Sequence, residues 1–390
     1  MSEIFDFDKV IDRREVPALK YHRMVLGDDG MDLFPASVAD MDFEIAPAIL
    51  EAMQGRLKHG LFGYEAVPDE LFQALTGWFQ RRYDWRIDQE HILRAPNVLN
   101  SLAIAVSLFS EPGEGIIIQP PVFFDFYDVI KENHRRIKFN PLVLKDGRYE
   151  MDFEGLEKAA SDSKTKLFFL CNPHNPVGRV WRRDELELAG EICRHHNVVV
   201  VSDEIHADIT YSGHRYTPFA SLSDADAENS ITCLSPAKSF NIAACCSSFT
   251  VVPDETRREA FKAENSRLTV NKNNAFASTA MEAAYKHGDT WLDACIDYLW
   301  ENISLLRKRL DGIQQVNLIE PEGTFLVWLD MRNMNLSPDE LTKFLRTRAK
   351  WAVARGIAFG EEGAGFARVN IACSRRDLDA ALRQLEAALE

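Results

Sequence analysis

Short apolar runs alternate with longer helical patterns between about residues 48 and 290. The apolar runs have the length of buried strands. They cover residues 115–119, 166–171, 198–202, 231–234 and 247–252. The helical patterns between them include residues 97–109, 184–196 and 254–265. Because strands that alternate with helices form largely parallel sheets covered on both faces, this part of the chain is predicted to be an α/β domain.

The pattern changes after residue 290. A long helix over 291–310 is followed by short strands around 324–329. Ser337 and Pro338, with two acidic residues after them, have the signature of a helix start. A strand near 368–372 and a last helix complete a smaller α+β domain. We therefore expect an N-terminal segment that packs with the small domain, a large domain and a small domain, over residues 1–47, 48–288 and 289–390 respectively.

Charge and composition exclude several classes of protein. The formal net charge is −15, whereas a nucleic-acid surface needs a basic stripe. The most apolar stretch, residues 99–109, is interrupted by polar residues and is too short to span a membrane. The N-terminus lacks the apolar core of a signal peptide, and the seven cysteines form no CxxC pair. We expect a cytoplasmic protein with reduced thiols and no nucleic-acid or membrane partner.

Four chemically distinctive residues each follow a predicted strand. They are Phe123, Asn172, Asp203 and Lys238. In an open parallel sheet, ligands bind outside the carboxyl ends of the strands. A lysine amine can form a Schiff base with an aldehyde, and a carboxylate can keep a pyridine nitrogen protonated. With an amide to contact a ring oxygen and an aromatic ring to stack, this set matches the needs of pyridoxal 5′-phosphate (PLP).

The phosphate of this cofactor also needs a binding site. Val98 and Leu99 follow Asn97 at the predicted start of a helix, where free N–H groups and the helix dipole favour an anion. Ser235, three residues before Lys238, offers a hydroxyl group.

A metal site is the alternative for one acidic segment, which contains Asp203, Glu204, His206 and Asp208. Neighbouring side chains at a strand end face opposite sides, and no HExxH-type spacing occurs. We therefore predict no metal.

Eight segments of the chain carry a resemblance to a known family. They are SVADMDF (37–43), FGY (62–64), QPPVFFDFY (119–127), NPHNPVGRVW (172–181), SDEIHADI (202–209), SPAKSFNIA (235–243), EGTFLVWLD (322–330) and FARVNIACSR (366–375). The chain resembles the fold-type I PLP enzymes of the aminotransferase superfamily, and within them the MalY/PatB branch of cystathionine β-lyases. The resemblance implies a large, mostly parallel-sheet cofactor domain and a smaller α+β domain.

The resemblance also implies roles for the residues at the strand ends. Lys238 would form the Schiff base and shuttle protons, and Asp203 would pair with the pyridinium nitrogen. Asn172 would contact the ring oxygen. Phe123 would stack on one face of the ring, and Ile205 would pack on the other.

Further residues would bind the phosphate and the substrate. Ser235 and the amides of Val98 and Leu99 would hold the phosphate. Tyr64 would reach the phosphate of a neighbouring subunit, which implies a homodimer with shared active sites. Arg368 would clamp the α-carboxylate of an amino-acid substrate, for which a bidentate guanidinium is suited.

Three positions depart from the pattern of the branch. Ser37 stands where the branch usually has Trp, Phe123 stands where it usually has Tyr, and the glycine-Val-Val phosphate turn is replaced by 97–99, Asn-Val-Leu. Phe123 keeps an aromatic ring that can stack on the cofactor. It lacks the phenol hydroxyl of tyrosine, which could donate a proton. We expect these departures to leave PLP binding intact. We expect them to affect which substrate is bound and how departure of the leaving group is assisted.

The first functional hypothesis is a PLP-dependent carbon–sulfur β-lyase that cleaves a cysteine S-conjugate such as cystathionine to thiol, pyruvate and ammonia. The alternative is a PLP-dependent aminotransferase, because both reactions begin when Lys238 removes the Cα proton. A third hypothesis is a regulatory protein that retains PLP, which the complete catalytic set disfavours.

Overall fold

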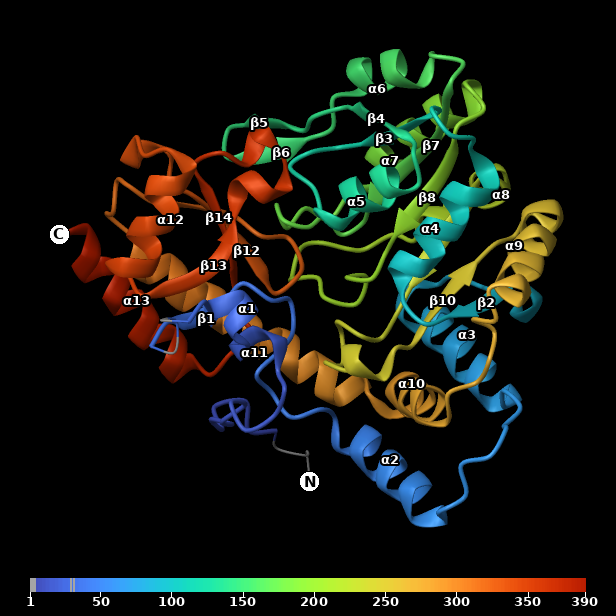
Figure 1. The fold of residues 1–390 in the computed structure, drawn as a ribbon, viewed down its shortest axis with the longest axis horizontal. Helices are drawn as coiled ribbons and strands as arrows, with labels where there is room; N and C mark the ends of the chain where they lie inside the picture. The colour runs from blue at the N-terminus through green and yellow to red at the C-terminus, as the bar shows by residue number, and fades with distance from the viewer. Residues whose placement is uncertain (1–4, 29, 31) are drawn as a thin grey trace.

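The computed structural model describes residues 5–28, 30 and 32–390. Its larger sheet has seven strands in the order β2-β10-β9-β8-β7-β3-β4 (Figure 1). In that order they cover Ile92–Ala95, Ser248–Val251, Ser230–Leu234, Val199–Asp203, Thr165–Cys171, Gly115–Ile118 and Arg136–Phe139. β10 pairs antiparallel with both its neighbours, and the other pairs are parallel. The five predicted strands are confirmed, and β2 and β4 extend the sheet at its edges.

Helices cover both faces of this sheet because its strands are apolar on both sides. Within β3, Ile116 and Ile118 pack in one core cluster and Ile117 packs in another. The helices of the first cluster are α4, α5 and α9, over Val98–Phe109, Asp125–Glu132 and Glu255–Arg267. The helices of the second are α6 and α7, over Phe153–Ala160 and Arg183–His195.

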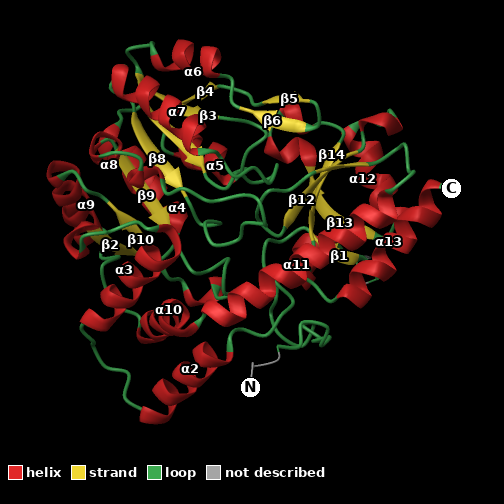
Figure 2. Ribbon diagram, turned by 180° about the vertical axis from the view of Figure 1, so that it is seen from behind, coloured by secondary structure: helices red, strands yellow, loops and turns green. Residues whose placement is uncertain are grey.

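The smaller sheet combines the two ends of the chain. Its order is β1-β13-β14-β12-β11, and β1 pairs parallel with β13. In that order the strands cover Phe34–Ala36, Trp351–Arg355, Phe366–Asn370, Leu326–Asp330 and Asn317–Ile319. Its helices are α11, α12 and α13, over Asp289–Leu310, Pro338–Thr347 and Arg375–Leu389 (Figure 2). The division of the chain after residues 47 and 288 stays a prediction, and the pairing of β1 with β13 shows that the N-terminal segment contributes a strand to this sheet.

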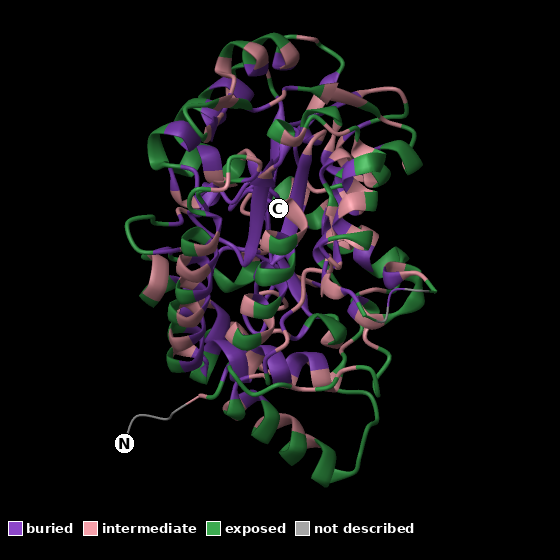
Figure 3. Ribbon diagram, turned by 90° about the vertical axis from the view of Figure 1, so that its left-hand side faces the viewer, coloured by how far each residue is buried: buried purple, intermediate pink, exposed green. Residues whose placement is uncertain are grey.

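The remaining elements lie around these two sheets. A hairpin is formed by β5 and β6, over Val143–Lys145 and Arg148–Glu150. The other helices are α1, α2, α3, α8 and α10, over Arg23–Leu26, Pro47–His59, Asp69–Tyr83, Asp224–Glu228 and Ala275–His287. The strands of the large sheet are mostly buried, except the edge strand β4, whereas most of α2 is exposed (Figure 3). Within the described residues, no helix is both long and apolar enough to cross a membrane.

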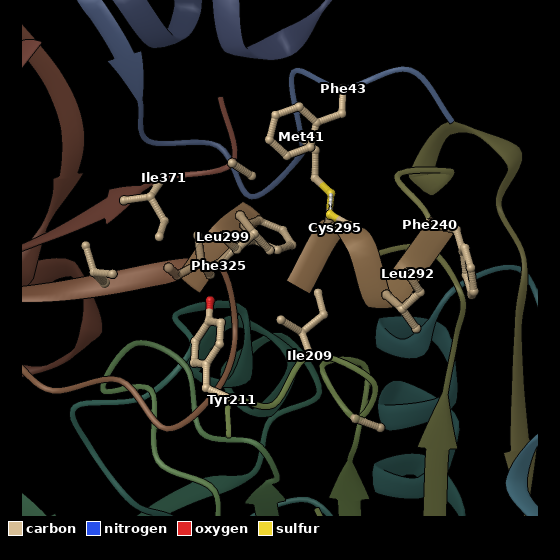
Figure 4. Close-up of a cluster of buried hydrophobic side chains, with 14 of the residues drawn as sticks. Met41, Phe43, Ile209, Tyr211, Phe240, Leu292, Cys295, Leu299, Phe325 and Ile371 are labelled. Carbon is tan, nitrogen blue, oxygen red and sulfur yellow. Dashed lines mark hydrogen bonds between the residues drawn. The ribbon is translucent and has the colours of Figure 1, made fainter. Parts of the chain in front are cut away.

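A shared hydrophobic core joins the two parts of the fold along α11 (Figure 4). Leu292, Cys295 and Leu299 of this helix are fully buried. Around them lie side chains from the N-terminal segment, the large domain and the small domain, namely Met41, Phe43, Ile209, Tyr211, Phe240, Phe325 and Ile371. Burying an apolar side chain stabilises a fold by roughly 1.5–3 kcal/mol. This core therefore fixes the N-terminal segment next to residues that come hundreds of positions later.

Candidate active site

A cavity of about 240 Å³ lies at the carboxyl ends of the central strands. Its lining residues come from the N-terminal segment, the start of α4, the start of α5, the loops after β7, β8 and β9, and the loop before β10. They are Ala39, Pro96, Asn97, Val98, Leu99, Phe123, Asp125, Cys171, Asn175, Asp203, Ile205, His206, Ser235, Ala237, Lys238, Ala243 and Ser247. The cavity thus contains seven of the ten predicted site residues, and the other three are Tyr64, Asn172 and Arg368.

Lys238 lies four residues beyond the end of β9, and its side chain is half-buried. Its Nζ donates a hydrogen bond to the carbonyl oxygen of Ala39, at 2.7 Å. Burial lowers the pKa of the Lys238 amine to about 8, with a smaller contribution from the positive charge of Arg368. A larger fraction of this amine is therefore neutral near physiological pH than for an ordinary lysine, which favours nucleophilic and base chemistry.

Asp203 is the last residue of β8 and is only 4% exposed. Its Oδ1 accepts a hydrogen bond from the backbone N–H of Ile205, at 3.1 Å. Burial raises the pKa of Asp203 to about 6, opposed by that hydrogen bond and by the charge of Lys238. No ion pair to this carboxylate forms within the described residues. Since a buried carboxylate is costly without a cation, the site suits a positively charged ligand atom.

The amide on the cavity wall belongs to Asn175 rather than to Asn172, and this corrects the predicted placement. Asn172 is fully buried, and its Nδ2 donates to the carbonyl oxygen of Thr217, at 3.0 Å. Its amide nitrogen is therefore already used to tie two loops together. Asn175 lines the cavity and accepts a hydrogen bond from Arg368 through Oδ1, at 3.0 Å. Its own Nδ2 has no hydrogen-bond partner among the described residues, so it is free to contact a ligand.

Apolar walls enclose the space next to Asp203. Phe123 and Ile205 both line the cavity and are half-buried. The Phe123 ring is itself held against Phe126, with ring centroids 5.9 Å apart in an edge-on arrangement. A flat aromatic ligand between these walls would have one aromatic and one aliphatic face contact, as the family resemblance implies.

The start of α4 provides an anion site at one end of the cavity. The side chain of Asn97 caps the helix by accepting from the N–H of Asn100, at 2.8 Å. The N–H groups of Val98 and Leu99, in the first turn, have no acceptor within the helix. These donors and the positive end of the helix dipole favour a phosphate.

Two serines stand near this helix start. The hydroxyl of Ser235 donates to the carbonyl oxygen of Ser247, at 2.6 Å, and accepts from the N–H of Ala237, at 3.0 Å. To donate to a phosphate, the Ser235 hydroxyl must therefore give up its hydrogen bond to the carbonyl oxygen of Ser247. The Ser247 hydroxyl is buried, lines the cavity and has no partner among the described residues. Ser247 is thus a second hydroxyl available to an anion.

Arg368 lies in β14. It does not line the cavity itself, but it contacts Asn175, which does. It is 2% exposed and donates to Asn175 Oδ1 and to the carbonyl oxygen of Ser37, at 3.0 and 2.8 Å. Its guanidinium stacks on the ring of Phe359, 4.8 Å from the centroid. Burial lowers the pKa of Arg368 to about 9. Because Arg368 has no ion pair within the described residues, it is available to an anionic substrate group.

Tyr64 lies outside the cavity of the single chain. It stands in the loop between α2 and α3, and its side chain is fully exposed. Ser37, also singled out from the sequence, contacts Arg368 through its backbone, while its buried hydroxyl has no partner. No group of His, Cys, Asp and Glu side chains in the described part of the chain has the arrangement of a metal site.

Comparison with known proteins identifies the family. A model of the aminotransferase class I and II family matches residues 32–385. The chain belongs to the aminotransferase class I and II family. Among members of this family, cystathionine β-lyase PatB of Bacillus subtilis is 42% identical over 385 residues, which is 98% of this chain and 100% of that protein. This similarity places the chain in the cystathionine β-lyase and C–S lyase branch of the aminotransferase family.

Solved structures agree with this assignment. The structure of cystalysin of Treponema denticola contains a PLP cofactor. It matches this chain with a TM-score of 0.95 and 32% identity, and the match covers 99% of each chain. The PLP-bound C–S lyase of Staphylococcus hominis has a TM-score of 0.90 and 30% identity, covering 100% of this chain and 99% of that one. The fold is therefore that of the fold-type I PLP enzymes.

The cavity of this aminotransferase-family protein fits such a cofactor. It contains an amine of lowered pKa, a buried carboxylate without a cation and unpaired donors at a helix start. Sequence reasoning missed several lining residues, namely Ala39, Asp125, Asn175, His206 and Ser247. Four of them lie inside segments that carry the family resemblance, so the signal was present there for Ala39, Asp125, Asn175 and His206. Ser247 has no comparable signal, because it lies in a loop whose path only the tertiary fold defines.

Proposed function

We propose that this protein is a PLP-dependent carbon–sulfur β-lyase that cleaves a cysteine S-conjugate of the cystathionine type. The observation that carries the proposal is that the half-buried amine of Lys238 shares one cavity with the unpaired carboxylate of Asp203. The choice of a lyase is supported by PatB, a cystathionine β-lyase with 42% identity over 98% of this chain.

The cofactor would be held by residues from six segments. Lys238 Nζ is the amine that would bond to the aldehyde carbon, and Asp203 would keep a proton on the ring nitrogen. Phe123 and Ile205 would enclose the ring, and the Asn175 amide is available to its phenolic oxygen. The helix-start amides would bind the phosphate, together with the hydroxyl groups of Ser235 and Ser247. When bound, PLP supplies an electron-withdrawing ring that accepts the electron pair released at Cα.

The protein's own groups would then direct the reaction. Arg368 would bind the substrate α-carboxylate and so fix the orientation of Cα. Lys238, once released, would remove the Cα proton, which its lowered pKa suits it to do near neutral pH. Loss of this proton allows the Cβ–S bond to break with departure of the thiolate. Addition of one water overall gives thiol, pyruvate and ammonia.

Continuous pyruvate release without a keto acid is the expected result for such a lyase. The purified holoenzyme is incubated with cystathionine and other cysteine thioethers, with no keto acid added. Pyruvate, ammonia and thiol should accumulate in equal amounts over many turnovers, because elimination returns the cofactor to its aldehyde form each cycle. A single stoichiometric burst that restarts only on addition of a keto acid would refute the lyase. That outcome would favour an aminotransferase, the second candidate, which the match to the aminotransferase family model supports.

We also propose that two subunits share each active site, with Tyr64 reaching the phosphate of the neighbouring subunit. The exposed side chain of Tyr64, on the protruding segment after α2, supports this proposal. A mixture of Tyr64→Ala and Lys238→Ala chains should regain activity in heterodimers, up to about a quarter to a half of wild type, since one composite site is intact. Subunit exchange is verified with differently tagged chains. Exchange without any regained activity would mean that each chain has a self-contained site.

A further inference from the structure

Asp125 is a carboxylate in the cavity that the steps above do not use. It is the first residue of α5 and lines the cavity two positions after Phe123. Among the cavity-lining residues, only Asp125 and Asp203 are acidic. Because Asp203 is committed to the cofactor ring, Asp125 is the one lining carboxylate left to face a substrate.

Asp125 has no partner within the described residues that would explain a carboxylate at this position. Its half-buried side chain makes no hydrogen bond and no ion pair there, and it does not cap α5, whose N-cap residue Phe124 has no side-chain cap. Burial raises the pKa of Asp125, and the charge of Asp128 adds to this effect. An unpaired carboxylate in such a position costs stability, and a bound cation would remove that cost.

The charges around Asp125 indicate where a substrate would meet it. The positive charges of Lys238 and Arg368 both lower the pKa of Asp125, so this carboxylate lies within electrostatic range of both. A substrate with its α-carboxylate on Arg368 and its Cα next to Lys238 would occupy the space between those two residues. Its side chain would then extend within reach of Asp125. The group it presents there should be cationic, because the carboxylate of Asp125 lines the cavity without a partner of opposite charge.

We propose that Asp125 is a specificity-determining residue that selects cysteine S-conjugates whose sulfur substituent ends in an ammonium group. This inference rests on the proposed lyase function and names its substrate class. The ammonium would donate to the carboxylate of Asp125 while the α-carboxylate is bound by Arg368. A neutral sulfur substituent would leave Asp125 unpaired, and an anionic one would be repelled by its carboxylate.

The first test compares two conjugates of nearly equal size, S-(2-aminoethyl)-L-cysteine and S-propyl-L-cysteine, in wild-type and Asp125→Asn holoenzymes. The wild-type ratio of kcat/KM values, cationic over neutral, should fall by about tenfold or more in the variant, the scale of one charged hydrogen bond. The two thiols also differ as leaving groups, and comparing the ratio between variant and wild type cancels that difference. Glu132→Gln is the matched control, because Glu132 is the exposed last residue of α5 and does not line the cavity.

The second test measures binding without C–S cleavage. L-Lysine and L-2-aminoheptanoate, which lack a leaving group and differ in the terminal ammonium, are titrated against the cofactor absorbance. Wild type should bind lysine more tightly relative to its neutral analogue than Asp125→Asn does. Melting temperature and cofactor content establish that the variant is folded, and Asp125→Ala should reproduce the effect if Asp125→Asn is not folded.

Equal ratios in wild type and both Asp125 variants would overturn the role of Asp125. Failure of every conjugate to yield pyruvate would instead count against the lyase. In that event the ratio of lysine binding to 2-aminoheptanoate binding still decides whether Asp125 selects a cation. Failure of the lyase proposal can therefore be distinguished from failure of the proposal for Asp125.

Discussion

Replacing Lys238 by alanine is expected to leave a folded protein that binds PLP only non-covalently and turns over on the order of 10⁴-fold more slowly, the upper range for loss of a general base. The same nitrogen would bond the cofactor and move the Cα proton, so both capacities are lost together. Folding should persist, because the side chain makes only one hydrogen bond within the described residues, to Ala39.

Borohydride reduction followed by peptide mass spectrometry measures the attachment directly. In wild type the pyridoxyl group should be on the peptide that contains Lys238, and in the variant it should be absent. Added primary amines should restore part of the proton transfer, as a base delivered from solution. Lys262→Ala, on the exposed surface of α9, is the matched control and should behave as wild type. A pyridoxyl group found on another lysine would refute this assignment.

Replacing Asp203 by asparagine should lower turnover by about 10³-fold, the scale for removal of one electrostatic stabiliser of a transition state. Asparagine keeps the shape and can still accept the N–H of Ile205, which Asp203 Oδ1 accepts at 3.1 Å. It carries no negative charge, so it cannot hold a proton on the ring nitrogen. Turnover by the cofactor-loaded variant within tenfold of wild type would contradict this role.

The cofactor-free protein provides a readout that does not depend on activity. Burial raises the pKa of Asp203 from the ordinary 3.8 to about 6, so its proton is bound more tightly in the folded state than in the unfolded state. The stability associated with this group is therefore full below the unfolded pKa and is lost as the pH rises through about 6. Asparagine has no such loss. The melting temperature of apo Asp203→Asn, relative to apo wild type, should rise between pH 4 and pH 7, and an unchanged difference would contradict the burial of a charged Asp203.

Local patterns in the sequence determined five of the seven strands of the large sheet. Continuous apolar runs of strand length, separated by helical periodicity, are sufficient to predict β3, β7, β8, β9 and β10, because a strand buried on both faces has few polar positions. The same patterns predicted that Asp203 and Lys238 meet, since the carboxyl ends of neighbouring parallel strands lie at one edge. Both residues line the cavity.

Tertiary structure decided what depends on how distant segments pack. Two asparagines occur in the NPHNPVG segment, and only the path of this loop makes Asn175 the cavity amide while Asn172 is tied to Thr217. Ser37 and Arg368 meet across 331 positions of sequence. The strand β1 joins the C-terminal sheet because the apolar core along α11 holds the N-terminal segment there. Such contacts have no periodicity along the chain, because they arise from the burial of side chains that are neighbours only in the folded molecule.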